Sequence, residues 1–340
     1  MGEAGGVSRK QLLSDEQWAL VEPLLPPQRS GRGRPMRDHR QVVEGVIYRY
    51  RCGIAWRDLP EEFGPWQTVW KRHRRFSGDG TWDLVHQALV AKADAVGAVD
   101  WVVSVDSTIN RAHQHATNLP RGERPDPAAG TAAEVTAESI GSAGAQPNDK
   151  NQLLAGGLRA VDAQFQGLYD EPADHAIGRS RGGLSSKIHA LVDHDGRPLV
   201  VLVGPGQAND SPVFPQLMAR LKVARPGRGR PRTRPTAVLA DKAYSARAHR
   251  HALRARGIQT VIPEPSDQIR NRKRRGSAGG RPPAFDPVLY RDRNVVERNF
   301  NTVKQWRGLA TRYDKLAIVY RGGAVLRAMT IWTRVFGDMP

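Results

Sequence analysis

The stretch that most constrains this chain is residues 290–304, with the sequence YRDRNVVERNFNTVK. Four polar residues follow at offsets of three, four and seven, which at about 100° per residue places them on one helical stripe: Tyr290, Arg293, Glu297 and Lys304. Three apolar residues form a second stripe roughly a quarter turn away: Val296, Phe300 and Val303. The stretch therefore predicts one helix with an apolar edge in the core and a carboxylate, two cations and a phenol facing one partner. A solvent-exposed helix also mixes charges in this way, so both interpretations stay open.

The net charge of +18 is the strongest property of the whole 340-residue sequence. Such a charge favours a polyanionic partner, because each phosphate contact by Lys or Arg releases a counterion. Nucleic acid fits better than an acidic membrane surface, since no basic amphipathic helix ends in exposed apolar residues and no apolar run approaches ~20 residues. The N-terminal residues lack a signal-peptide core, and the single cysteine, Cys52, excludes an internal disulfide. We therefore expect a cytosolic protein without a membrane segment.

Three short helices are predicted near the N-terminus, over residues 11–25, 38–52 and about 65–75. In the third, Val69 and His73 share an inward face, and several polar or basic residues lie outside it: Gln67, Lys71, Arg72, Arg74 and Arg75. This pattern is typical of a helix-turn-helix domain that reads the major groove, although a merely solvated basic face looks the same. A fourth helix over 82–97 leads into the rest of the chain. The basic Gly- and Pro-rich segment 29–35 is either a minor-groove arm or a linker.

Two apolar strands each carry a carboxylate. In the strand 99–108, Asp106 lies on the face opposite Val103 and Val105, since side chains alternate along a strand. A carboxylate in so apolar a strand is costly unless it is paired or bound to a metal, but an Asx turn at the strand end explains it equally well. A second buried strand begins at Thr236 and ends at Asp241. Strand ends of this kind hold functional carboxylates in α/β folds.

The remaining elements alternate between strands and helices. We expect a hairpin formed by 185–193 and 198–203, helices over 212–222 and 246–256, a strand over 259–263 and a last helix over 316–335. From residue 117 to 177 periodicity is lost, and Ala, Gly, Pro, Ser and acidic residues dominate. We interpret most of this segment as a flexible insertion, with one possible helix over 151–169. His113 and His115 do not indicate a zinc site, because no further Cys or His cluster completes four ligands.

Several separated regions resemble bacterial insertion-sequence transposases of the Asp-Asp-Glu class. The spacing Tyr-x2-Arg-x3-Glu-x6-Lys in 290–304 is similar to the signature of that family and is matched without a gap. The segments Trp-Arg-Asp-Leu-Pro (56–60) and Phe-Gly-Pro-Trp-Gln-Thr-Val (63–69) resemble the N-terminal domain on one branch of these enzymes. The segment 307–315 also resembles the family, whereas the insertion does not.

The resemblance implies a set of site residues and a cofactor. Three carboxylates would be both catalytic and metal-binding: Asp106, Asp241 and Glu297. They would hold two Mg²⁺ or Mn²⁺ ions per active site, because two hard cations assist phosphodiester transfer and prefer oxygen ligands. Tyr290, Arg293 and Lys304 would hold the cleaved transposon end, the two cations through phosphate contacts.

We therefore predict an α/β fold: a ribonuclease-H-like mixed sheet flanked by helices, with an N-terminal all-α helix-turn-helix-like domain. The expected domains are 1–97, which binds DNA, and 98–340, which is catalytic and interrupted by the insertion 117–177. In this topology the first strand and the strand after the hairpin lie side by side, so that Asp106 and Asp241 meet.

The predicted activity is that of a transposase that binds terminal inverted repeats, cleaves the transposon ends and joins the 3′-hydroxyls to target DNA. Its partner is double-stranded DNA, on which we expect a homodimer, in the bacterial cytosol and associated with the nucleoid. Two alternatives remain: a non-catalytic DNA-binding regulator derived from a transposase, and a junction-cutting nuclease of the same fold.

Overall fold

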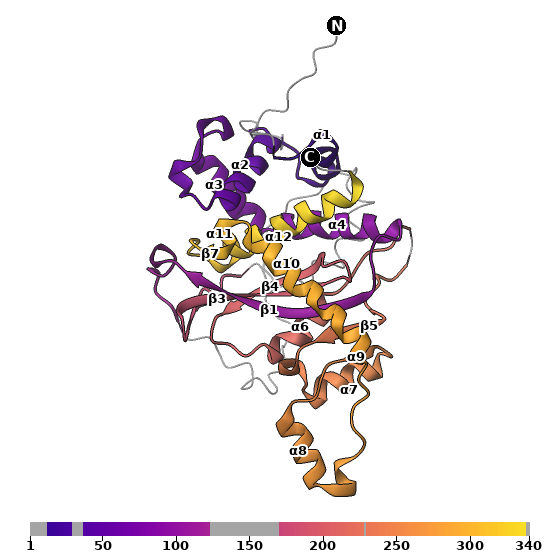
Figure 1. Ribbon diagram of the computed structural model, residues 1–340. Coiled ribbons are helices and arrows are strands. Elements are labelled where there is room, and N and C mark those ends of the chain that lie inside the picture. Colours follow the sequence, from indigo (N-terminus) through magenta and orange to yellow (C-terminus); the bar gives the residue numbers. More distant parts are fainter. Residues whose placement is uncertain (1–11, 29–36, 123–169, 228, 338–340) are drawn as a thin grey trace, which may run out of the picture.

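The computed structural model describes residues 12–28, 37–122, 170–227 and 229–337. Its centre is a seven-stranded mixed sheet with helices on both sides (Figure 1). The strands are β1 (Val102–Ala112), β2 (Gly178–Ser180), β3 (Gly183–Val192), β4 (Pro198–Pro205), β5 (Ala237–Ala240), β6 (Gln259–Val261) and β7 (Thr311–Arg312). The basic segment 29–35, most of the predicted insertion and its possible helix over 151–169 lie outside the described residues.

The order of the sheet is β2-β3-β1-β5-β6, with β4 paired to β3 and β7 paired to β1. β1 runs antiparallel to β3 and parallel to β5, so the expected pairing of the two carboxylate strands is confirmed. The expected hairpin is also confirmed, because β3 and β4 pair antiparallel on either side of the turn 193–197.

The two faces of β1 differ as the alternation of its residues predicted. Val103 and Val105 are fully buried in the main hydrophobic core. Val102, on the opposite face, packs with Ala237, Leu239 and Val261 in a small second cluster. β1 continues beyond the predicted end at residue 108, since its pairing with β3 extends to Arg111 opposite Ser185.

Four helices precede the sheet: α1 (Asp15–Val21), α2 (His39–Cys52), α3 (Trp66–Gly78) and α4 (Thr81–Ala95). Ser14 caps α1 through a reciprocal capping box with Gln17. α2 ends at Gly53, whose φ of 69° is readily adopted by glycine. The four predicted N-terminal helices are therefore present, with shorter bounds at several ends.

The C-terminal part of the chain is held to these N-terminal helices by two buried ion pairs. Arg49 of α2 donates to Asp314 at 2.9 Å, with side-chain exposures of 2% and 3%. Arg321 of α12 (Ala317–Thr333) donates two hydrogen bonds to Asp83 of α4. α12 thus joins helices from the start of the chain to the sheet, and residues from all three belong to one hydrophobic core. The division into domains 1–97 and 98–340 stays a prediction.

The remaining helices are α6 (Phe214–Arg220), α7 (Arg247–Ala255), α8 (Ser266–Arg274), α9 (Pro287–Tyr290), α10 (Asn294–Lys304) and α11 (Arg307–Ala310). The prediction of one unbroken helix over 290–304 is wrong, because the 3₁₀ turn Arg291–Arg293 separates α9 from α10. A 3₁₀ turn advances about 120° per residue, so it rotates Tyr290 away from the stripe expected for an α-helix. Val296, Phe300 and Val303 are buried as predicted.

Both ends of the predicted insertion belong to the folded body. Gly122 N donates to Ala173 O at 2.9 Å, and Ala176 and Ile177 are buried. The carboxylate of Glu171 accepts hydrogen bonds from the backbone of Ala317 and Ile318 at the start of α12. The bounds 117–177 are therefore too wide at both ends. Within the described ranges, no helix is both long and apolar enough to cross a bilayer.

Candidate active site

Asp106 and Asp241 lie close together at the end of β5. Val105 of β1 pairs in parallel with Ala240, the last residue of β5, so Asp106 follows on β1 at the level where Asp241 follows directly after β5. The carboxylate of Asp241 accepts a hydrogen bond from Ala243 N at 2.8 Å, which turns the chain at the end of β5. The carboxylate of Asp106 accepts one from Ser107 N at 2.8 Å. The sheet therefore brings together two acidic residues that lie far apart in the sequence.

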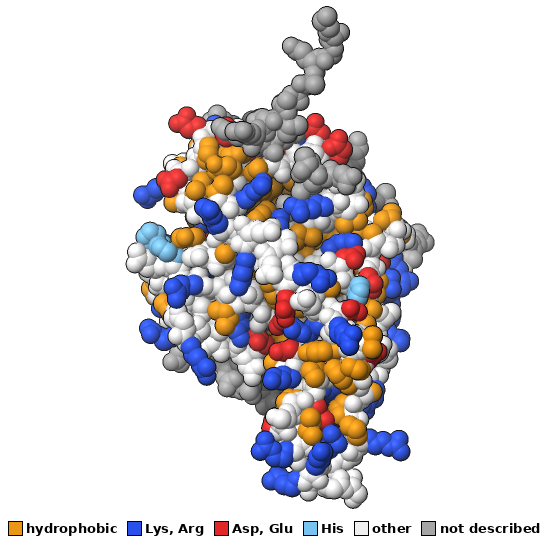
Figure 2. All heavy atoms as spheres, in the orientation of Figure 1, with side chains coloured by type: hydrophobic (Ala, Val, Ile, Leu, Met, Phe, Trp, Pro, Cys, Tyr) orange, Lys and Arg blue, Asp and Glu red, His pale blue; other side chains and the backbone are white. Residues whose placement is uncertain are grey.

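Glu297 reaches this position through Arg293. The guanidinium of Arg293 donates to Asp106 Oδ2 at 2.8 Å and to Glu297 Oε1 at 2.5 Å. The side chains of Arg293 and Asp106 are 17% and 21% exposed, while Glu297 is 53% exposed. One arginine thus links the carboxylate of β1 to that of α10, and Figure 2 shows acidic side chains gathered in the middle of this face among Lys and Arg.

The pKa of Asp106 reflects its burial and the charges around it. Burial raises the pKa of Asp106 above its ordinary value, and the negative charge of Asp241 acts in the same direction. The hydrogen bond from Ser107 and the cation of Arg293 oppose this shift without cancelling it. A half-buried carboxylate next to a second negative charge is a place where a bound cation is favourable.

A fourth carboxylate, Asp210, which was not among the predicted site residues, lies close to Asp106. Asp210 accepts hydrogen bonds from Ser107 Oγ at 2.9 Å and from Lys187 Nζ at 2.8 Å. Tyr244 is fully buried, and its hydroxyl has no hydrogen-bond partner among the described residues. Burial raises the pKa of Tyr244, and the charges of Asp210, Asp106 and Asp241 raise it further. A buried phenol therefore lies within the field of three carboxylates.

Sequence signals for these neighbours were weak. Asp210 is the aspartate of an Asn-Asp-Ser-Pro turn, where aspartate usually bonds to the backbone. Lys187 lies inside the β-hairpin, and only the pairing of β1 with β3 places it near the carboxylates. Tyr244 stands three residues after Asp241, a closeness that gives no sign of burial by itself.

The donor atoms suit a hard divalent cation, because all three predicted ligands are carboxylates and carboxylate oxygens are the usual ligands of Mg²⁺. In the described part of the chain, however, no three acidic, His or Cys side chains already stand at positions that would hold a metal ion. The guanidinium of Arg293 is paired to both Asp106 and Glu297 and occupies the position between them.

The other two residues of the 290–304 signature lie on either side of Arg293. Tyr290 packs against the small cluster of Ala237, Leu239 and Val261, with its ring 5.2 Å from that of Phe285. Lys304 Nζ donates to Ile109 O of β1 at 3.4 Å, and partial burial lowers its pKa. Both residues thus flank the carboxylates, on opposite ends of the helical segment.

The predicted DNA-facing residues of α3 differ in exposure. Gln67, Lys71, Arg74 and Arg75 are exposed, and Arg75 is within 3.4 Å of Asp79. Arg72 is partly buried, since it donates to His39 Nδ1 at 3.0 Å and lies over the ring of Phe76. Four of the five residues therefore face solvent, whereas Arg72 also holds α3 to α2.

Comparison with protein families gives two matches. Residues 13–86 match a family described as a putative transposase of the IS4/5 family, and residues 153–330 match the transposase DDE domain. The second match includes Asp241 and Glu297, whereas Asp106 lies between the two matched segments. The placement of Asp106 beside them therefore comes from the sheet rather than from either family match.

Similar proteins point in the same direction. A putative transposase for insertion sequence element IS6501 of Brucella ovis is 32% identical over 44% of this chain and all of its own length. A putative transposase for insertion sequence element IS402 of Burkholderia cepacia is 33% identical over 44% of this chain and 61% of its own length. An uncharacterized 16.2 kDa protein of IS402 from the same species is 38% identical over 30% of this chain and 75% of its own length.

No solved structure matches the chain. The DDE-domain match alone spans more than half of the 340 residues, and the Brucella ovis relative is matched over its entire length. The chain therefore belongs to the family of insertion-sequence transposases of the DDE class.

Proposed function

We propose that this protein binds the terminal inverted repeats of its element, cleaves DNA at the transposon ends and joins the resulting 3′-hydroxyls to target DNA. The observation that carries the proposal is the closeness of Asp106 on β1 and Asp241 directly after the neighbouring parallel strand β5, with Glu297 linked to Asp106 by Arg293. Family membership supports the reaction class, and the net charge of +18 supports a DNA substrate.

The sheet is proposed to be a ribonuclease-H-like core. Three antiparallel neighbours, β4, β3 and β1, are followed by the parallel strands β5 and β6, and α10 packs on β1. This is the arrangement expected for such a core from the order of the elements. It puts the end of β5, the middle of β1 and the start of α10 at one place.

Asp106, Asp241 and Glu297 are proposed to hold two Mg²⁺ or Mn²⁺ ions. When bound, such ions activate the attacking oxygen and stabilise the leaving 3′ oxygen. The chain itself orients the ligands: Ser107 N fixes one oxygen of Asp106, and Ala243 N fixes one oxygen of Asp241. Asp210, held by Ser107 and Lys187, supports the β1 backbone beside Asp106.

Arg293 is proposed to exchange partners when DNA arrives. A guanidinium that leaves Asp106 and Glu297 needs another anion, and a phosphate of the cleaved strand offers two oxygens in suitable geometry. Lys304 and Tyr290 would contact the same strand from either side. The N-terminal helices would bind the repeat through Gln67, Lys71, Arg74 and Arg75 of α3, with Arg72 beside them. Two ends must be processed, so a homodimer on DNA is expected.

The test uses the full-length protein with duplexes that carry the ends of its own element and Mg²⁺. Asp241→Asn and Glu297→Gln keep the side-chain shape and remove the charge, so we expect cleavage to fall by about 10³-fold or more while DNA affinity is retained. Asp195→Asn, in the β3–β4 turn, is the matched control and should cleave as the wild type does. Cleavage by Asp241→Asn at the wild-type rate would exclude the proposed chemistry.

The same assay separates the two alternatives. A non-catalytic regulator binds the ends without cutting them, whatever the metal. A junction nuclease cuts branched DNA and leaves a 3′-hydroxyl end unjoined to a target duplex. Joined products from pre-cleaved ends are expected only of a transposase.

A further inference from the structure

Between β6 and α9 the chain leaves the body of the molecule and returns, forming a projection that contains α8 (Figure 1). We call residues 264–282 the basic arm. It contains six Lys or Arg and two acidic residues: Arg270, Arg272, Lys273, Arg274, Arg275 and Arg281 against Glu264 and Asp267. The lower end of the molecule in Figure 2 is correspondingly covered with Lys and Arg. Packing does not explain this sequence, because no residue of α8 is buried.

The basic arm is nevertheless a defined structure. Arg272 donates to both carboxylate oxygens of Glu264, at 3.2 and 3.0 Å, which holds α8 to the first residue of the arm. At the tip the chain folds so closely onto α8 that a side chain on Gly279 would meet Arg272 O at 2.1 Å. Only glycine fits there. The arm therefore presents its cations from a fixed frame rather than from a loose loop.

The cations of α8 are divided between two sides. Arg270, Lys273 and Arg274 are related by offsets of three and four, so they share one face of the helix. Arg272 lies on the opposite side, where it pairs with Glu264. All three residues of the first face are exposed, and among the described residues none of them forms an ion pair. Asp267, in the first turn of α8, lies on the same side, so this face keeps a net positive charge and its three cations are not neutralised by ion pairs.

The root of the arm is tied to the candidate active site. β5 and β6 are parallel, so the arm leaves the sheet at the same edge as Asp241. Ser245, four residues after Asp241, donates to Gln268 Oε1 of α8 at 3.0 Å, and Arg250 of α7 donates to the same Ser245 hydroxyl at 2.8 Å. The position of the arm is thus set by the segment that also carries a catalytic candidate.

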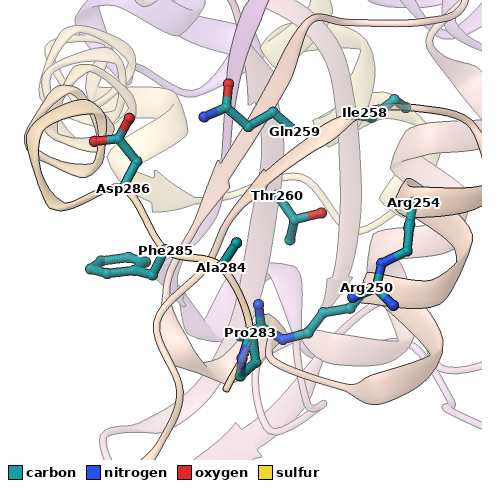
Figure 3. A pocket seen from close by; sticks show the side chains of 9 residues that line it. All are labelled: Arg250, Arg254, Ile258, Gln259, Thr260, Pro283, Ala284, Phe285 and Asp286. Carbon is teal, nitrogen blue, oxygen red and sulfur yellow. The ribbon is translucent and has the colours of Figure 1, made fainter. Parts of the chain in front are cut away.

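The segment that returns from the arm forms an open pocket with β6 and α7 (Figure 3). Its volume is about 310 Å³, and its lining includes Phe285 of the return segment and Arg250 and Arg254 of α7. None of the three candidate carboxylates lines it. The exposed Arg254 places another cation beside the root of the arm, so positive charge continues from α8 towards the body.

We propose that the basic arm binds the phosphate backbone of duplex DNA, in the part of the substrate next to the bond that is cut. The identity of the ligand rests on the proposed function; the site itself rests on the fixed arm and its positive face. Four residues of helix span about 6 Å, and along the duplex axis one DNA strand carries a phosphate every ~3.4 Å, so this face can meet two successive phosphates. Such contacts position DNA without reading its sequence.

The first experiment measures the salt dependence of DNA affinity with a fluorescent duplex of random sequence. Arg270→Gln, Lys273→Gln and Arg274→Gln are combined in one protein. The matched control combines Arg179→Gln, Arg225→Gln and Arg230→Gln, three exposed arginines on other segments. We expect the arm variant alone to bind at least about tenfold more weakly near 0.1 M salt, and its log–log salt slope to flatten by about 2 to 3. Circular dichroism checks that each protein is folded.

The second experiment locates the contact. In a Cys52→Ser background, Ser277→Cys at the tip of the arm carries a photoactivatable group, and crosslinks to a duplex with the element's end are mapped. Crosslinks that cluster beside the cleavage site are expected. The proposal for the arm is overturned if the arm variant binds DNA with the wild-type affinity and salt slope, or if the tip does not crosslink to bound DNA. Cleavage by the wild-type protein in the same experiments would leave the proposed transposase function standing. A wild type that binds DNA through the arm but neither cuts nor joins it would instead refute the proposed function alone.

Discussion

Arg293 donates to Asp106 across 187 residues of sequence, at 2.8 Å, and the same guanidinium holds Glu297 one helical turn away. A cation of the protein therefore stands between two of the carboxylates that are candidates for holding metal ions. The consequence is a competition between the guanidinium and divalent ions.

Replacement of Arg293 should strengthen divalent binding in the absence of DNA. In Arg293→Met the carboxylates of Asp106 and Glu297 lose their charge-assisted partner, so the affinity for Mn²⁺ should rise by roughly tenfold or more. Isothermal titration calorimetry measures it, with Arg291→Gln, an exposed neighbour, as the control. Unchanged or weaker Mn²⁺ binding in the Met variant would show that Arg293 does not compete for the site.

The basic residues of α3 should separate into DNA contacts and structural contacts. Lys71→Gln should weaken DNA binding and flatten the salt slope by about 1, with little change in the free energy of unfolding. Arg72→Gln should instead lower stability by about 1 kcal/mol, because Arg72 donates to His39 and covers Phe76. Fluorescence anisotropy and urea denaturation on the same two proteins measure both quantities. Equal effects in both assays would contradict the division.

Loss of the buried Asp314 should be severe. Asp314→Asn leaves Arg49 without its anion at 2% exposure, so the free energy of unfolding should fall by about 3 to 5 kcal/mol. Asp15→Asn breaks the more exposed pair with Arg40 and should change stability by less than about 1 kcal/mol. Urea denaturation compares the two proteins. Similar losses would mean that burial does not decide the strength of these pairs.

Ionisation of Asp193 should lower the free energy of unfolding as the pH rises towards neutrality. Burial raises its pKa to about 7 from an ordinary value of 3.8, against the hydrogen bond and charge of Arg197. At a pH between these two values, Asp193 is protonated in the folded protein and ionised in the unfolded chain. The free energy of unfolding therefore falls by about 4 kcal/mol as the pH rises from the lower value to the higher one.

Asp193→Asn keeps the acceptor for Arg197 N and cannot ionise. The thermal midpoint of this variant relative to the wild type should therefore be higher at pH 8 than at pH 5. A constant difference would place the pKa of Asp193 at its ordinary value.

Local patterns predicted most of the sheet and helices for identifiable reasons. Val103 and Val105 alternate with Asp106, so the strand and its buried face could be recognised from sequence. The break after Tyr290 also has a signal in the sequence: Asp286 caps α9 through Val288 N and Leu289 N, and Pro287 occupies its first turn. A helix that begins at Pro287 reaches Tyr290 as its last residue, which leaves a tighter turn before α10.

Contacts made by distant segments could not be predicted in this way. α8 lacks an apolar stripe, and the periodicity used to find helices depends on such a stripe. Ser107 and Lys187 both reach Asp210 only because β1 pairs with β3, in a register that no local pattern specifies. The link between Arg293 and Asp106 similarly depends on how α10 crosses the sheet.

The two buried ion pairs that join α2 and α4 to the C-terminal region also bear on the length of the DNA substrate. Arg49 pairs with Asp314 and Asp83 pairs with Arg321, and α3 packs against α2, α4 and α12, so α3 and the carboxylates belong to one folded body. If α3 binds the repeat as proposed, the protein would fix the number of base pairs between the bound repeat and the cleaved bond, and the DNA would have to bend to fit that distance.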